Sequence, residues 1–292
     1  MRASEENTKP EKYNIPITFT IDSENYEDTT TKFVFNITDP VVKSFILPKK
    51  PSKYIILNPK QTGFYRVNYD AENWSNIKTG LWKDNFDDIH VMNRAQIVDD
   101  LFNLARAGVI EYKTAVDIIR YIKKEKNYIP WLSAINNGLT FLSQRVALKD
   151  RDRKLFEWFV LDTMEDVYKH LTFNDKDTES RTDVYNRVNI QSWLCKYGHK
   201  GCIDESVKVF ELFMKNGTKV HKNRRSIVYC NGVRNGNVMQ FDFLYNKLAT
   251  ESIAAEQLNL LIGMACTKEP ALVKVKLETI LWKCFLKIWW KF

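Results

Sequence analysis

The residue types that most often bind metals or carry catalysis are sparse in this sequence, and their spacing suits neither task. The chain of 292 residues has four histidines, which are His90, His170, His199 and His221. None belongs to an H-E-x-x-H motif, in which two histidines on one helix face bind zinc and the glutamate acts as a general base. Glu165 and His170 are five residues apart, which does not place them as a ligand pair on one helix face. We therefore expect no metal site and no catalytic residue in this chain.

Motifs for phosphate binding and for nucleophilic catalysis are also missing from the sequence. It contains no G-x-G-x-x-G, P-loop or G-x-S-x-G sequence. The glycine-rich stretch 232–237, GVRNGN, is interpreted as a turn between helices. Adjacent carboxylates such as Asp99 and Asp100 project from a helix in different directions, so we expect both to be solvated. Cys195 and His199 are open to two interpretations, a nucleophile pair or a disulfide or structural role for the cysteine, and the second is favoured.

Cysteines and glycosylation motifs supply the other candidate site residues. No C-x-x-C pair occurs, so a zinc ribbon or zinc finger is not expected. The five cysteines are Cys195, Cys202, Cys230, Cys266 and Cys284. The sequon Asn-x-Ser/Thr occurs at Asn36, Asn73 and Asn216, which are candidates for glycosylation in a secreted chain. A motif of three residues also occurs by chance, which is the alternative interpretation at each of the three positions.

The composition is that of a globular protein, with 44% hydrophobic and 27% charged residues. Half of the net charge of +8 falls in residues 268–292, which hold six lysines and two glutamates. The rest of the chain has no basic stripe, so we do not expect nucleic-acid binding. No apolar run approaches the ~18–20 residues that span a bilayer, and the polar start MRASEENTKPEKY is not a targeting signal.

Residues 13–70 show the alternation of apolar and polar side chains that is typical of β-strands. In the last segment Tyr65 and Val67 fall on one face, and Phe64 and Arg66 on the other. About seven strands are usual for a free-standing sandwich, and fewer are predicted here. Residues 1–70 are therefore interpreted as an incomplete antiparallel β-sandwich domain, with strands at 13–21, 31–37, 54–58 and 62–70.

After residue 70 the apolar period becomes helical. The segment 93–108, NRAQIVDDLFNLARAG, has an apolar stripe at i, i+3, i+4 and i+7. Asn93 and Gln96 suit a capping box at its start, and Gly108 suits its end. The predicted fold class is mainly α, with residues 71–292 as a large α-solenoid-like domain of stacked helix pairs. Its further helices are expected at 112–125, 151–170, 182–197, 203–215, 222–234, 238–249, 253–266 and 270–290.

Four segments together are similar to a known family. They are 58–74 (NPKQTGFYRVNYDAENW), 93–108, 228–233 (VYCNGV) and 264–273 (MACTKEPALV). They resemble the C-terminal half of insect-type zinc aminopeptidases of the aminopeptidase N family, over a stretch from about Tyr13 to about Glu278. The resemblance implies that residues 62–70 end a β-sandwich domain. It also implies that the helices form a bowl that covers the active-site cleft and shapes peptide access.

The resemblance gives the cysteines an expected pairing. It implies disulfides Cys195–Cys202 and Cys230–Cys266, and it leaves Cys284 without a counterpart. From about residue 279 the sequence diverges from the family. This tail, 279–292, carries lysines on one side and apolar residues elsewhere. It is either a helix that packs on the preceding pair, which is favoured, or a basic amphipathic helix on a membrane surface.

The catalytic motifs of that family, H-E-x-x-H and G-x-M-x-N, do not occur in this chain. The resemblance therefore implies a non-catalytic region with no cofactor of its own, zinc being bound by an upstream domain that is missing here. Its partners would be peptides, held through that domain, and its location the cell exterior or the plasma membrane surface. Two alternatives stay open. The chain is a piece of a longer active metallo-aminopeptidase that removes N-terminal residues from peptides, or it is a helical scaffold that binds peptides or proteins.

Overall fold

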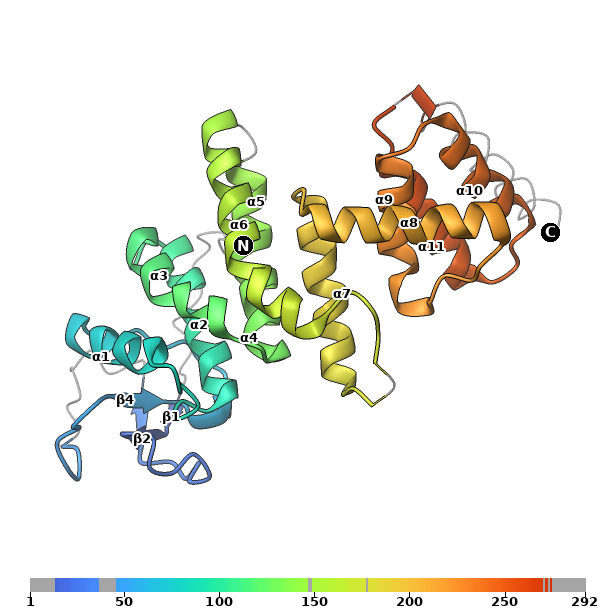
Figure 1. Cartoon of the computed structure of the whole chain (residues 1–292). Coiled ribbons are helices and arrows are strands. Elements are labelled where there is room, and N and C mark those ends of the chain that lie inside the picture. The colour runs from blue at the N-terminus through green and yellow to red at the C-terminus, as the bar shows by residue number, and fades with distance from the viewer. Residues whose placement is uncertain are drawn as a thin grey trace, which may run out of the picture. The chain divides into compact units, whose positions relative to one another are not determined.

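The computed structural model describes residues 14–36, 46–146, 149–176, 178–269, 271–272 and 274. Within these ranges the chain forms helices joined by short turns, preceded by four short strands (Figure 1). It divides into two compact units, Met1–Arg153 and Lys154–Phe292. The N-terminal unit holds the strands and the first helices, and the described part of the C-terminal unit is helical.

The four strands form two small antiparallel sheets. β1 (Asn14–Ile17) pairs with β3 (Phe33–Asn36), and β2 (Phe19–Ile21) pairs with β4 (Ile55–Leu57). The predicted strand at 13–21 is thus divided between two sheets at Thr18. The second sheet is the buried one, because Phe19, Ile21 and Ile56 are at most 8% exposed.

The strand predicted at residues 62–70 is wrong, since the structure has no strand in that segment. The predicted faces are nonetheless correct, because Val67 is buried whereas Phe64 and Arg66 are exposed. Extended backbone becomes a strand only where a second strand pairs with it. Here the backbone N–H of Val67 donates to the Asp100 side chain instead. The alternation therefore identified the buried face but not the hydrogen-bond partner.

The helices of the N-terminal unit are arranged around α2. Helix α2 packs against α3, α4 and the π-helical segment η3, and it buries Ile97, Val98 and Leu101. The apolar stripe predicted for residues 93–108 is therefore confirmed. The elements of this unit are η1 (Pro59–Gln61), α1 (Ala71–Trp82), α2 (Val91–Arg106), α3 (Tyr112–Ile119), η2 (Arg120–Lys124), α4 (Tyr128–Ser133), η3 (Ala134–Leu139) and α5 (Thr140–Val146).

Helix α2 begins before the residue that was predicted to cap it. Its N-cap is His90, and the Nδ1 atom of His90 accepts a hydrogen bond from the backbone N–H of Met92 at 3.2 Å. The predicted Asn93 cap is therefore wrong, and Asn93 lies fully buried in the first turn. At the other end Gly108 has a φ of 75°, which confirms the expected helix end.

The C-terminal unit is built from helices that pack on their neighbours in the chain. Helix α7 packs against α8 and α9, and α9 also packs against α10 and α11. Their shared core includes Phe210, Tyr229, Phe241, Leu244 and Met264. The mainly α fold class is thereby confirmed. The elements are α6 (Asp150–Leu171), which contains the boundary between the units, α7 (Arg181–Lys196), α8 (Lys200–Asn216), η4 (Lys222–Arg224), α9 (Arg225–Arg234), α10 (Val238–Thr250) and α11 (Ala254–Met264).

One buried arginine fixes a loop in each unit. Arg94 of α2 donates to Glu125 with an Nε–Oε2 distance of 2.7 Å, and both side chains are at most 2% exposed. Arg187 of α7 donates to the backbone oxygen of Leu171 at 2.9 Å and pairs with Glu179. Removing one partner of such a pair leaves a buried charge without compensation, so both pairs are structural anchors.

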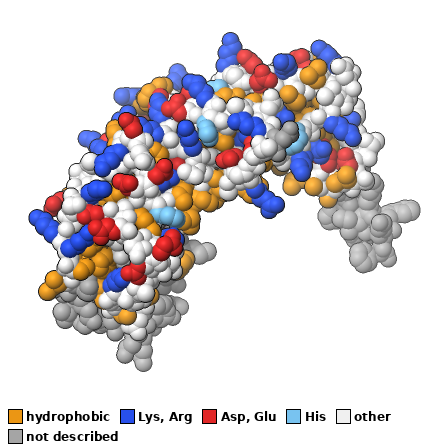
Figure 2. All heavy atoms as spheres, turned by 60° about the horizontal axis from the view of Figure 1, so that its bottom comes forward, with side chains coloured by type: hydrophobic (Ala, Val, Ile, Leu, Met, Phe, Trp, Pro, Cys, Tyr) orange, Lys and Arg blue, Asp and Glu red, His pale blue; other side chains and the backbone are white. Residues whose placement is uncertain are grey.

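Three remaining expectations concern membrane spans, surface charge and the C-terminal tail. No helix in the described ranges is long and apolar enough to cross a membrane. On the face drawn in Figure 2, Lys and Arg side chains are interspersed with Asp and Glu. Cys284, the 279–292 tail and most of the helix expected at 270–290 lie outside the described residues. The domain boundary at residue 70 stays a prediction.

Candidate functional site

The most unusual backbone of the N-terminal unit is the segment 58–68, called here the 58–68 loop, which links β4 to α1. Asn58, Lys60 and Gln61 all have φ values between 54° and 58°, in the left-handed region that non-glycine residues rarely adopt. Each such residue costs on the order of 1 kcal/mol or more. This conformation persists only because surrounding contacts hold it.

Asn58 and Asn93 supply the first set of those contacts. The Asn93 side chain accepts a hydrogen bond from the Lys60 N–H at 2.8 Å and donates to the Asn58 carbonyl at 3.1 Å. The Asn58 side chain in turn bonds both backbone groups of Gly63, at 2.7 and 2.8 Å. A Cβ at Gly63 would lie 2.3 Å from the Tyr65 ring, so a larger residue does not fit there unless that side chain moves.

Asp100 supplies the second anchor. Its Oδ2 accepts hydrogen bonds from the Val67 N–H at 3.2 Å and from Gln96 at 3.4 Å, and Gln96 also accepts one from Asn93 at 2.7 Å. The expectation that Asp100 is solvated is wrong, because it is 2% exposed. Burial raises the pKa of Asp100 to about 7, the nearby Asp99 carboxylate adds to the effect, and the Val67 hydrogen bond opposes it.

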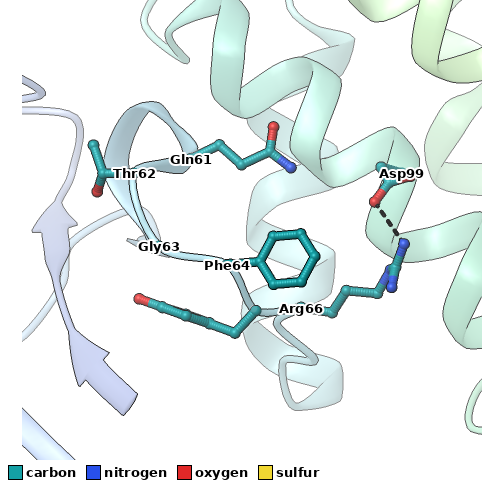
Figure 3. A pocket seen from close by; sticks show the side chains of 7 residues that line it. Gln61, Thr62, Gly63, Phe64, Arg66 and Asp99 are labelled. Carbon is teal, nitrogen blue, oxygen red and sulfur yellow. Dashed lines mark hydrogen bonds and ion pairs between the residues drawn. The ribbon is translucent and has the colours of Figure 1, made fainter. Parts of the chain in front are cut away.

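The outer side of the loop borders an open cavity of about 300 Å³ (Figure 3). Its lining comprises Gln61, Thr62, Gly63, Phe64, Tyr65, Arg66 and Asp99. Phe64 is fully exposed, and Arg66 pairs with Asp99 at 3.2 Å. In Figure 3 the side chains of Gln61, Phe64 and Arg66 project to the same side of the loop. This arrangement contains no nucleophile with an adjacent base, so its chemistry is that of a contact surface.

The structure brings four of the predicted cysteines together in pairs. A disulfide joins Cys195 at the end of α7 to Cys202 in α8, with a Cα–Cα distance of 5.3 Å. A second joins Cys230 in α9 to Cys266 after α11, at 5.1 Å. Cys195 is therefore not available as a nucleophile for His199, which instead caps α8 by accepting from the Cys202 N–H at 3.1 Å.

The three sequons lie in different surroundings. Asn216 is exposed at the end of α8. Asn73 is half-buried, and its side-chain amide bonds the N–H and the carbonyl of Ile55 in β4, both at 2.9 Å. Asn36 is the last residue of β3. Glycosylation at any of them stays a prediction.

Metal-binding geometry is absent from the described ranges. They contain no group of three His, Cys, Asp or Glu residues placed to bind one ion. Two histidines pair with a single carboxylate each, His199 with Glu165 and His221 with Asp175, both at 2.9 Å. The family resemblance places zinc in an upstream domain and not at these residues, so no step through a metal is assigned to this chain.

The polar row Asn93, Gln96 and Asp100 is the functional feature that the sequence analysis missed. The three residues follow one another at i, i+3 and i+7, a spacing that places side chains on one face of a helix. The same spacing holds for the apolar core positions, so a polar set in this register was a signal of buried polar anchors.

Comparisons with known proteins agree with this architecture. The family model of the ERAP1-like C-terminal domain matches residues 54–283. The chain is 32% identical over 272 residues to a "Membrane alanyl aminopeptidase" of Manduca sexta, covering 93% of this chain and 27% of the relative. It is 35% identical over 217 residues to an "Aminopeptidase N" of Plutella xylostella, covering 74% and 23%. It is 29% identical over 274 residues to the Homo sapiens "Aminopeptidase N", covering 90% and 27%.

The chain thus spans about a quarter of the length of these relatives. The family match covers most of the chain and includes the 58–68 loop, helices α1 to α11 and all four disulfide-bonded cysteines. The chain therefore belongs to the family of ERAP1-like C-terminal domains and is related to the C-terminal region of aminopeptidases of the aminopeptidase N family.

Proposed function

We propose that the chain is the non-catalytic C-terminal region of a zinc aminopeptidase, where it covers the active-site cleft and shapes which peptides enter. The relatives carry aminopeptidase names and are about four times as long as the stretch they share with this chain. The remaining three quarters of such a protein would bind the zinc and hold the peptide. This chain would act on peptides only through that part.

The observation that carries the proposal is the exposure of Phe64 on a fixed loop. Its side chain is fully exposed, although the neighbouring backbone is anchored through Asn93 and Asp100. Exposed aromatic and arginine side chains are enriched where proteins bind one another most tightly. A rigid loop presents them with little loss of conformational entropy on binding. Phe64 and Arg66 are therefore assigned to the contact with the catalytic part.

The proposal is tested by association in trans. The remaining three quarters of the Manduca sexta relative would be coexpressed with this chain, and the complex measured by chromatography with light scattering. We expect a complex with the unaltered chain and at least about tenfold weaker binding with Phe64→Ala. Trp158→Ala is the matched control, because Trp158 is an exposed aromatic of α6 outside the loop. No complex, or equal weakening by both substitutions, would contradict the proposal.

The expected location follows from the disulfides. Disulfides persist mainly in oxidising compartments, and this chain has two of them. The relatives named membrane aminopeptidases support the same location. We therefore assign the chain to the cell exterior or the plasma membrane surface.

A further inference from the structure

Arg66 in the 58–68 loop lies between two neighbouring carboxylates of α2. Its Nη2 group donates to Asp99 Oδ2 at 3.2 Å, the contact drawn as a dashed line in Figure 3. Its Nε lies 4.0 Å from Asp100 Oδ1, which is about 1 Å longer than a hydrogen bond. Asp99 borders the cavity beside the loop, whereas Asp100 is buried. One N–H group of the guanidinium is thus bonded to α2, and the N–H at Nε is not.

The two oxygens of Asp100 have different surroundings. Oδ2 accepts hydrogen bonds from the Val67 N–H and from Gln96, whereas Oδ1 has no hydrogen-bond partner among the described residues. A neutral carboxyl group carries its proton on one oxygen, and Oδ1 is the oxygen that accepts no hydrogen bond. Loss of this proton leaves a buried carboxylate with one oxygen that lacks a donor, which is costly unless a donor reaches it. The N–H at Arg66 Nε is a donor within reach.

Burial and the nearest charges determine when Asp100 ionises. Burial has the largest effect and raises the pKa of Asp100 to about 7. The Asp99 carboxylate on the same helix also opposes ionisation, and the Arg66 guanidinium of the loop favours it. The carboxyl group of Asp100 therefore changes its charge near neutral pH.

The other elements that pack on α2 add little charge at Asp100. Tyr69, in the turn before α1, is a titratable group that faces Asp100, and burial raises the pKa of Tyr69, so it stays neutral. Lys60 of η1 pairs with Glu27 instead. In the described part of the chain, α3, α4 and η3 place no charged group against Asp100. Among the residues that the structure describes, Arg66 is therefore the cation that compensates a charge on Asp100.

We propose that Arg66 is a clamp of the 58–68 loop, which closes when Asp100 loses its proton. While Asp100 is neutral, the guanidinium bonds Asp99 alone, as in the structure. Once Asp100 is ionised, Nε moves toward Oδ1. The guanidinium then bonds both carboxylates through its Nε and Nη2 groups, whose fork geometry suits two acceptors. The proton of Asp100 leaves to water, and no covalent bond between heavy atoms changes.

Closing the clamp changes the surface that the loop presents. The Arg66 side chain is 52% exposed in the open state, and it projects to the same side of the loop as Phe64 (Figure 3). Bonding to Asp100 draws Arg66 toward α2 and leaves fewer of its N–H groups for a partner. The consequence for binding rests on the proposed function, which assigns Phe64 and Arg66 to the contact with the catalytic part. That contact becomes weaker above the pH at which Asp100 ionises.

The clamp is tested in the full, disulfide-bonded chain by nuclear magnetic resonance. The nitrogen chemical shift of Arg66 Nε would be followed from about pH 5 to about pH 9. We expect it to change with a midpoint near pH 7, because the hydrogen bond to Asp100 forms there. Asp100→Asn keeps an acceptor for the Val67 N–H but does not ionise, so the shift should stay constant. Asp88→Asn, at an exposed position of the same unit, is the matched control and should leave the midpoint unchanged.

A double-mutant cycle measures the same contact through urea unfolding. The coupling between Arg66→Gln and Asp100→Asn is expressed as a factor in the unfolding equilibrium constant. This factor should be at least about fivefold larger at about pH 8.5 than at about pH 5.5. The inference is overturned if the Arg66 Nε shift does not titrate, if it titrates equally in Asp100→Asn, or if the coupling is the same at both pH values. Thermal melting of each variant verifies that it is folded.

Binding to the catalytic part separates the clamp from the proposed function. The complex with the remaining three quarters of the Manduca sexta relative should be about threefold or more weaker at about pH 8.5 than at about pH 5.5. The complex of Asp100→Asn should not show this loss. The same pH dependence for both chains would overturn regulation by the clamp. Absence of a complex at either pH would contradict the proposed function alone, because the titration of the isolated chain involves no partner.

Discussion

The buried carboxylate of Asp100 provides the sharpest test of how the 58–68 loop is held. Asp100 is 2% exposed, and it binds the Val67 N–H through one oxygen only. Its other oxygen, Oδ1, has no hydrogen-bond partner among the described residues and lies 4.0 Å from the Arg66 Nε. Substituting Asp100→Asn keeps an acceptor for Val67 and removes the buried charge. The free energy of unfolding should therefore respond to pH differently in the two proteins.

The size and sign of the effect follow from the pKa of Asp100. Burial raises this pKa from 3.8 to about 7, so the folded chain holds a proton that the unfolded chain has released. Between about pH 4 and pH 7 the folded state binds more protons, and its stability falls as the pH rises. The difference between the two pKa values corresponds to at most about 4 kcal/mol. Stability from this group is complete at low pH and is lost as the pH approaches 7.

The assay is urea unfolding of both proteins at about pH 5 and about pH 8, with hydrogen exchange of residues 62–70 as a local probe. We expect Asp100→Asn to be the more stable protein at the higher pH and the difference between the two to be clearly smaller at the lower pH. The exposed Asp88→Asn substitution, in the same unit, should leave the pH dependence unchanged. Parallel pH profiles for the unaltered chain and Asp100→Asn would refute the reasoning.

Three further expectations concern stability and modification. Replacing both cysteines of the Cys230–Cys266 disulfide by alanine should lower the free energy of unfolding by about 4 kcal/mol. The same change at Cys195–Cys202 should lower it by about 2 kcal/mol. The values differ because the first disulfide spans 36 residues and the second spans 7. Urea unfolding measures both, and a larger loss for the shorter loop would show that packing decides instead. Glycopeptide mass spectrometry of the chain secreted from insect cells should find a glycan at Asn216 and none at Asn73, which keeps its amide bonded to β4; a glycan at the second position would contradict that hydrogen bond. Glu125→Ala should lower the free energy of unfolding by roughly 3–5 kcal/mol, because it leaves the buried Arg94 of α2 without its Glu125 partner. A loss below about 1 kcal/mol in urea unfolding would show that the Arg94 charge is solvated.

The helical part of the fold was predictable from the sequence because each helix carries one apolar stripe. The expected helix at 93–108 corresponds to α2, and Ile97, Val98 and Leu101 of its stripe are buried as predicted. A stripe at this period needs only local information, since it reports which face of a helix meets the rest of the protein. The mainly α class followed from several such stripes in series.

The site was less predictable, because it depends on contacts between distant residues. The sequence pattern placed Phe64 and Arg66 correctly on the exposed face. It did not predict that the Val67 N–H donates to the Asp100 side chain. A side chain 33 residues further along the chain takes the place of a neighbouring strand. Asp100 was expected to be solvated because adjacent carboxylates on a helix, here Asp99 and Asp100, project in different directions. The position of Asp100 at i+7 from Asn93, in the register of the apolar core, was a local signal of burial, but its hydrogen bond to the Val67 N–H is not encoded locally.

A cavity beside Arg234, which has no ion pair with a described residue, is lined by residues of α7, α9 and α11 and illustrates a second limit. Its residues come from three helices, and the sequence segment GVRNGN suggested only a turn. Whether an arginine has an acidic partner is decided by the register between packed helices. That register follows from side-chain packing over the whole unit, which a single sequence does not reveal.

The central claim is that this chain shapes peptide access to an aminopeptidase active site. The most direct measurement replaces the matching quarter of the Manduca sexta relative with this chain and compares hydrolysis of short and long alanyl peptides. The relative truncated before that quarter serves as the reference, together with the unaltered relative. We expect the chimera to restore the length preference of the unaltered relative, with kcat/KM for long peptides changed more than for short ones. Equal restoration or equal loss for all lengths would contradict the claim.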